Sequence, residues 1–167
     1  MTAPLPFDPI EEAARQWRAH GWDEAADGMA AVTSVMRAQA IMLARTEAVL
    51  RPLGLSFARY ELLTLLSFTR SGTLPMARAG TLLQVHPTSI TNAVRRLEKA
   101  GLVRREPHPS DGRAALIQIT EPGRELAAEA TKLINEAVFT QPGLSPDGLK
   151  LLFSVIRDFR REAGDFA

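Results

Sequence analysis

The segment from Pro87 to Ala100 carries the side chains with the most distinctive chemistry in this sequence. Ile90, Val94 and Leu97 recur at spacings of four and three residues, which predicts a helix with one apolar face. The opposite face and its flanks then hold seven polar side chains: Thr88, Ser89, Thr91, Asn92, Arg95, Arg96 and Lys99. Hydroxyls and an amide precede the cations, the order in which a helix in the major groove of DNA meets base edges and phosphates. An ordinary solvated helix face is the alternative interpretation.

The residues that flank this helix favour the first interpretation. Pro87 suits the first position of a helix, and Gly101 suits its end. Two β-prone runs follow, at 102–106 and 115–119, and the turn-rich residues 107–113 separate them. The pattern predicts a helix-turn-helix followed by a β-hairpin wing.

Positive charge is concentrated in the same region. Between positions 95 and 113 there are six Lys or Arg residues against three acidic ones, whereas the whole chain has a formal net charge of only +1. A surface that contacts DNA phosphates needs such a local excess of cations, and a near-neutral chain can still carry one.

A series of short motifs spans positions 88 to 123. They are Thr88-Ser89-Ile90-Thr91-Asn92, Arg96-Leu97-Glu98, Gly101-Leu102-Val103, Pro109-Ser110-Asp111-Gly112-Arg113, Leu116, Ile119-Thr120 and Gly123. This series resembles the MarR family of winged-helix transcriptional regulators, most characteristically in Asp111-x-Arg113. The resemblance implies that Arg113 enters the minor groove from the wing tip, with Asp111 orienting its guanidinium. Such insertion is physically reasonable because a narrow minor groove attracts arginine. An ordinary Asp–Arg turn pair is the alternative.

The other expected elements are helical, so the fold class is mainly α with a small β-hairpin wing. Helices are expected at about 10–20, 23–50, 56–68, 75–84, 120–138 and 146–161. Residues 71–73 are expected to form a loop, and Pro75 to begin the next helix. In that helix, Leu82 and Leu83 would brace the recognition helix.

The predicted helix 23–50 is too long for one small domain to cover. At 1.5 Å per residue it extends about 42 Å. Its apolar positions are Met29, Val32, Met36, Leu43 and Leu50, and those of the last helix are Leu149, Leu152, Val155, Ile156 and Phe159. We therefore expect a homodimer, as the family resemblance also implies. Residues 1–167 would form a single MarR-like domain, with dimerisation helices at about 10–50 and 121–163 and a DNA-binding lobe at about 55–120.

The resemblance further implies a cleft for a small anionic or phenolic effector between the dimerisation helices and the DNA-binding lobe. The candidate lining residues are Trp17, Trp22, Met36, Arg37, Arg45 and Tyr60. Each has a plainer interpretation, because arginines on a long helix are usually solvated and methionines at helical spacing usually pack in a core.

Composition excludes several other classes of function. The chain has no cysteine, and His20, His86 and His108 show no ligand spacing, so neither a metal site nor a cofactor is expected. No nucleophile–base pair or phosphate-binding glycine loop indicates an enzyme. No apolar stretch is long enough to span a bilayer and no signal segment is evident, so a cytoplasmic protein is expected.

The sequence thus predicts a homodimeric repressor that binds a pseudo-palindromic, double-stranded DNA operator and is released by a small molecule. The alternative is a winged-helix module with an architectural or protein-binding role and no ligand response.

Overall fold

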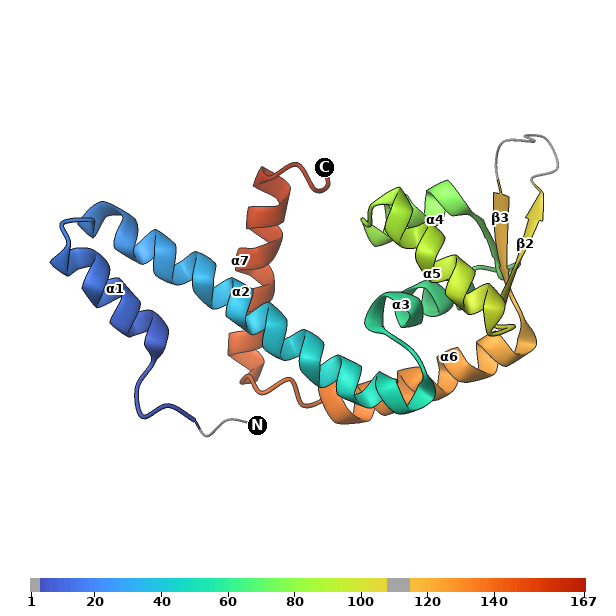
Figure 1. Ribbon diagram of the computed structural model, residues 1–167, viewed down its shortest axis with the longest axis horizontal. Helices are drawn as coiled ribbons and strands as arrows, with labels where there is room; N and C mark the ends of the chain where they lie inside the picture. The colour runs from blue at the N-terminus through green and yellow to red at the C-terminus, as the bar shows by residue number, and fades with distance from the viewer. Residues whose placement is uncertain (1–3, 108–114) are drawn as a thin grey trace. The chain divides into compact units, whose positions relative to one another are not determined.

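A computed structural model describes residues 4–107 and 115–167. The elements in chain order are α1 (Pro9–Ala19), α2 (Asp23–Leu50), the 3-10 turn η1 (Arg51–Leu53), α3 (Phe57–Ser67), β1 (Thr73–Pro75), α4 (Met76–Leu83), α5 (Pro87–Lys99), β2 (Val103–Pro107), β3 (Ala115–Ile119), α6 (Glu121–Ile134), the π-helical turn η2 (Asn135–Phe139) and α7 (Pro146–Glu162) (Figure 1). The mainly helical fold class with a small wing is therefore confirmed. The chain divides into two compact units, one ending at Glu61 and one beginning at Leu62 inside α3.

In the N-terminal unit, α1 and α2 form a helical hairpin (Figure 1). The Asp8 side chain caps α1 by accepting a hydrogen bond from the Ile10 N–H at 2.8 Å. Gly21, at φ 79°, supplies the left-handed backbone that the turn into α2 requires. Ala14 and Ala26 are buried, and their small side chains let the two helices approach closely.

The bounds predicted for the long helix are those of α2. Its expected apolar positions divide into two groups. Leu50 is fully buried, but Val32, Met36 and Leu43 are exposed in the single chain, with Met36 at 65%. Those exposed side chains belong to the apolar positions that we expect a partner subunit to cover.

A three-stranded antiparallel sheet, in the order β1-β3-β2, stands in the C-terminal unit. The expected hairpin is present, with Val103 opposite Ile119. The expected loop at 71–73 was wrong at Thr73, and Pro75 does not begin the next helix. Thr73 pairs with Gln118 and Pro75 with Leu116 in β1, and α4 begins at Met76.

The core of this unit lies where α3, α5 and β3 contribute apolar side chains. Its fully buried large residues include Leu62, Leu63, Leu66, Val94, Leu97 and Ile117. The expected brace from α4 is present, because α4 contacts α5, but of its two leucines Leu82 is 48% exposed and Leu83 is half-buried. Ala79 and Gly80 are the buried residues of α4, and their small size lets α4 pack closely against α5.

The start of α6 lies directly against the chain that enters the wing. Thr120 caps α6 by accepting from the Gly123 N–H at 3.2 Å. A Cβ added at Gly123 would lie 2.1 Å from the Leu102 carbonyl oxygen, so glycine alone fits there. The helix expected to reach about Val138 is α-helical to Ile134 and then continues as the π-helical turn η2 to Phe139.

The last helix, α7, begins as predicted, with Ser145 as its cap and Pro146 in its first turn. All of its residues are described, and none of them is buried. Phe153 and Phe159 are each 67% exposed, which is unusual for side chains of this size. The apolar residues of α7 therefore have no core within the single chain.

Candidate nucleic-acid interface

The candidate interface is built on α5. Pro87 occupies its first turn, and His86 caps it, because His86 Nδ1 accepts a hydrogen bond from the Thr88 N–H at 3.2 Å. Gly101, at φ 73°, follows its end. The predicted apolar face is confirmed by the burial of Ile90, Val94 and Leu97, which fixes the rotation of α5 about its axis.

The seven polar residues of the predicted face are all exposed: Thr88, Ser89, Thr91, Asn92, Arg95, Arg96 and Lys99. Two local hydrogen bonds shape this surface. The Thr91 hydroxyl donates to the Pro87 carbonyl at 2.9 Å, and Arg95 Nη2 donates to Asn92 Oδ1 at 3.1 Å. The Arg95 bond occupies one acceptor site of the Asn92 oxygen. The exposed Asn92 side chain still has its amide N–H donors and a second oxygen lone pair to offer a base.

The wing is joined to α5 by backbone and side-chain hydrogen bonds. The Leu102 N–H donates to the Leu97 carbonyl at 2.9 Å, and the Thr120 hydroxyl donates to the Gly101 carbonyl at 2.8 Å. These contacts hold the base of the wing against the C-terminal end of α5.

Two of the cations counted in the local charge excess have acidic partners. Arg105 Nε lies 3.2 Å from Glu98 Oε2, and Arg104 Nε lies 3.2 Å from Glu106 Oε1. Arg104 also donates to Gln118 Oε1 at 2.8 Å. The exposed cations of α5 are therefore better placed to meet phosphates than those of β2. Asp111 and Arg113, predicted for the wing tip, lie outside the described residues.

Sequence reasoning missed two contributors to this interface, His86 and the Glu98–Arg105 pair. A polar residue directly before a helix-starting proline was an available signal for the His86 cap. The Glu98–Arg105 contact had no local signal, because it depends on how β2 folds back toward α5.

The candidate effector residues do not meet in one cleft of a single chain. Trp17 and Trp22 form an edge-to-face pair with ring centroids 5.4 Å apart at the α1–α2 turn. Arg45 lies on the same continuous helix as Asp23, about 33 Å farther along at 1.5 Å per residue. Tyr60 is buried in α3. These four residues cannot line one small pocket of one protomer, and their role in binding an effector stays a prediction.

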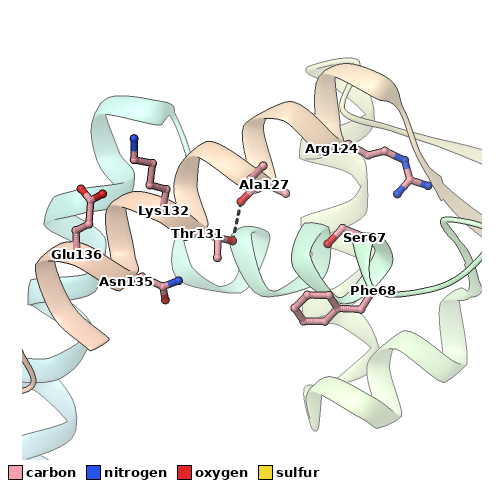
Figure 2. A pocket seen from close by; sticks show the side chains of 9 residues that line it. Ser67, Phe68, Arg124, Ala127, Thr131, Lys132, Asn135 and Glu136 are labelled. Atoms are coloured by element: carbon pink, nitrogen blue, oxygen red, sulfur yellow. Dashed lines mark hydrogen bonds between the residues drawn. The ribbon is translucent and has the colours of Figure 1, made fainter. Parts of the chain in front are cut away.

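A groove of about 560 Å³ lies elsewhere, between the end of α3 and α6 (Figure 2). None of the predicted effector residues lines it. Its lining residues are Ser67, Phe68, Arg124, Ala127, Ala128, Thr131, Lys132, Asn135 and Glu136. The π-helical turn contributes Asn135 and Glu136, and such turns often occur at functional sites. Among the described residues, no group of three His, Cys, Asp or Glu side chains is arranged to hold a metal ion.

The buried stripe of α5, its exposed polar face and the three-stranded sheet define a winged helix-turn-helix protein. The chain belongs to the MarR family. The family model matches residues 56–115. Sco5413, a MarR family transcriptional regulator from Streptomyces coelicolor, has a crystal structure 46% identical in sequence, covering 84% of this chain and 97% of that one, with a TM-score of 0.77.

Two further relatives are informative about function. Sco3205, another MarR family regulator from Streptomyces coelicolor, was crystallised in complex with DNA; it is 28% identical, with a TM-score of 0.69 over 80% of this chain and 88% of that one. The transcriptional repressor Rv2887 of Mycobacterium tuberculosis is 33% identical over 101 residues, 60% of this chain and 71% of the relative.

Matches to some other curated relatives are shorter. The chain spans about half the length of two of them, at 52% and 53%. MarR family members are transcriptional regulators, which agrees with the expectation that this chain is not an enzyme. Within the described part of the chain, no helix combines the length and apolar character needed to cross a membrane.

Proposed function

We propose that the chain is a sequence-specific, DNA-binding transcriptional repressor. The observation that carries this proposal is the division of α5 into a buried stripe and a polar face that stays exposed. Burial of Ile90, Val94 and Leu97 fixes which side chains face outward. The DNA complex of Sco3205 and the repressor Rv2887 support the proposal by similarity.

In this proposal α5 enters the major groove. The side chains of Thr88, Ser89, Thr91 and Asn92, in the N-terminal half of the helix, contact base edges. The guanidinium groups of Arg95 and Arg96 meet phosphates, and Arg113 with Asp111 contributes from the wing tip. Phosphate contacts set affinity and position, whereas base contacts set sequence preference.

The proposed functional unit is a homodimer. Met36 on α2 and Phe153 and Phe159 on α7 are exposed in the single chain, and burying each such side chain contributes about 1.5–3 kcal/mol. Covering both helices with a second copy removes this apolar surface from water. In the proposed dimer a two-fold axis relates the two α5 helices. Binding in successive major grooves requires these helices to lie about 34 Å apart.

The groove between α3 and α6 is the proposed effector site. Arg124 and Lys132 supply positive charge, and the exposed Phe68 ring supplies an aromatic surface. Asn135 adds an amide that can bind a hydroxyl or carboxylate. This lining suits a small anionic or phenolic molecule, whose binding would release the repressor from its operator.

The alternative function is an architectural or protein-binding winged-helix module without ligand response. Both functions can involve binding of a positively charged surface to DNA. Only a sequence-specific regulator binds some duplexes more tightly than others at a fixed salt concentration.

Selection from random duplex DNA, followed by sequencing of the retained fragments, tests the proposal. We expect an inverted repeat with half-sites about one helical turn apart. The protein should first be dialysed or refolded, so that a co-purified effector does not suppress binding. After that step, retention without any enriched motif would favour the architectural alternative.

A further inference from the structure

The turn between α4 and α5 is tied to the C-terminal segment of the chain. Gln84 follows α4, and its Nε2 donates to the backbone carbonyl of Asp165 at 3.0 Å and to the Asp165 carboxylate at 2.5 Å. Its Oε1 accepts from Arg160 Nη2 at 3.2 Å. Both polar atoms of the Gln84 side chain are therefore engaged by residues that follow it by 76 and 81 positions.

The C-terminal segment is folded back so that it can make this contact. The Asp165 N–H donates to the Arg160 carbonyl at 3.0 Å, and Gly164, at φ 76°, supplies the left-handed backbone of the turn. Arg160 Nε also donates to the Asp165 carboxylate. The Arg160 guanidinium lies 5.4 Å from the centroid of the Phe166 ring, a cation–π contact. Arg160 thus links Gln84, Asp165 and Phe166.

The backbone conformation of Gln84 is also unusual. It has φ 53°, and it is the one non-glycine residue with positive φ among positions 4–107 and 115–167. Glycine or asparagine usually fills this position at a helix end. Glutamine is less suited than glycine or asparagine to this left-handed backbone. The contact of its side chain with the C-terminal segment explains why glutamine stands here.

We propose that Gln84, Arg160 and Asp165 form a latch, and that the latched position of α4 and α5 is the one that binds DNA. This inference rests on the proposed DNA-binding function and names the positioning residues for it. With the latch closed, Thr88, Thr91 and Asn92 remain exposed, so the contact leaves the polar face of α5 accessible.

The latch connects the recognition helix to the helix that carries much of the unburied apolar surface. If α7 pairs with a partner subunit, the latch sets the position of each α5 relative to the dimer axis. Opening it lets the turn and α5 take other positions. The apparent DNA affinity then falls in proportion to the fraction of molecules that remain in the binding position.

Asp165→Ala is the most direct test, because the loss of a negative charge and the loss of the latch should change DNA affinity in opposite directions. Removing a carboxylate from a DNA-binding protein should by itself strengthen binding. The latch predicts about fivefold weaker binding to the selected operator duplex instead. The matched control is Asp158→Ala, which removes an acid on α7 that pairs with Arg157 and Arg161 rather than with Gln84. The control should bind as tightly as the parent or more tightly.

A double-variant cycle separates the latch from independent effects. Gln84→Asn shortens the amide while keeping a residue that tolerates positive φ. It should weaken binding as much as Asp165→Ala does, and the two changes together should be no worse than either one. Arg160→Ala should weaken binding more than Arg157→Ala, which removes the same charge from α7 at a residue that contacts Phe153 and Asp158.

Hydrogen exchange gives a readout that does not require DNA. Amides of residues 80–90 should exchange faster in Asp165→Ala than in the parent or in Asp158→Ala. Unchanged exchange, or operator affinity equal to or above that of the parent, would overturn the latch. If the parent binds no duplex at all, the proposed DNA-binding function fails, and the exchange comparison alone decides whether the latch exists.

Discussion

Glu98 and Arg105 connect the recognition helix to the wing, with the Arg105 Nε 3.2 Å from the Glu98 carboxylate oxygen. Glu98 lies in the last turn of α5, and Arg105 lies in β2. Both side chains are partly exposed, so water and salt screen the attraction between them. The backbone hydrogen bond from the Leu102 N–H to the Leu97 carbonyl spans the same junction and joins two uncharged groups.

We predict that Arg105→Ala lowers the free energy of unfolding by no more than about 1 kcal/mol, because exposed ion pairs contribute little. Urea denaturation of the parent and the variant at low and moderate salt is the measurement. The difference should shrink as salt is added. A loss of several kcal/mol would mean that the pair is a main support of the wing.

Arg96→Ala should weaken binding to every duplex by a similar factor. In the proposal Arg96 neutralises a phosphate, so its loss reduces the slope of log affinity against log salt by about one. Fluorescence anisotropy with selected and scrambled duplexes across a salt series measures this slope. Lys150→Ala, which removes an exposed cation from the start of α7, is the control and should leave the slope unchanged. An identical slope for Arg96→Ala would remove it from the phosphate contacts.

Gly123→Ala should destabilise the fold by about 1–3 kcal/mol or more, because the added methyl group overlaps a backbone carbonyl. That carbonyl belongs to Leu102, 2.1 Å from the Cβ position. Gly28→Ala in α2 is the matched control, since nothing lies within 4 Å of its Cβ position. The control should gain about 0.5–1 kcal/mol from reduced backbone entropy of the unfolded chain. Thermal unfolding followed by circular dichroism distinguishes the two variants. Equal changes in melting temperature would contradict the close approach of Gly123 to the Leu102 carbonyl.

Glu61→Gln should raise stability near neutral pH. Burial raises the pKa of the Glu61 carboxyl above its ordinary value, so folding favours the protonated form. The contribution of Glu61 to stability is then fully present below the ordinary glutamate pKa and is lost as pH rises through the raised value. Urea denaturation at about pH 4 and about pH 7 checks this dependence. The advantage of Glu61→Gln should appear only at the higher pH, and an equal advantage at both pH values would contradict the raised pKa.

The helices were largely predictable because local residues mark their ends. Asp23–Leu50 has the predicted bounds, and Ser145 with Pro146 begins α7 as expected. The apolar stripe of α5 follows from its spacing, and its burial confirms the orientation of the helix. These features depend on interactions within a few residues, which a sequence pattern contains.

The features that the sequence did not predict depend on contacts between distant residues. β1 is three residues long, and its pairing with β3 is what makes it a strand. The exposure of Leu82 and the latch at Gln84 depend on how whole elements pack. The candidate effector residues were chosen by chemical type, and they lie on three different helices or their ends: Trp17 in α1, Arg45 in α2 and Tyr60 in α3.

The central claim is that the exposed face of α5 reads DNA sequence. Parallel selections from random duplex DNA with the parent and with Asn92→Ala test it most directly. We predict that the parent enriches an inverted repeat, and that Asn92→Ala enriches the same repeat with relaxed preference at one position in each half-site. The discrimination lost there should be about 1–3 kcal/mol. An enriched motif that is identical for both proteins, or no motif for the parent, would contradict the claim.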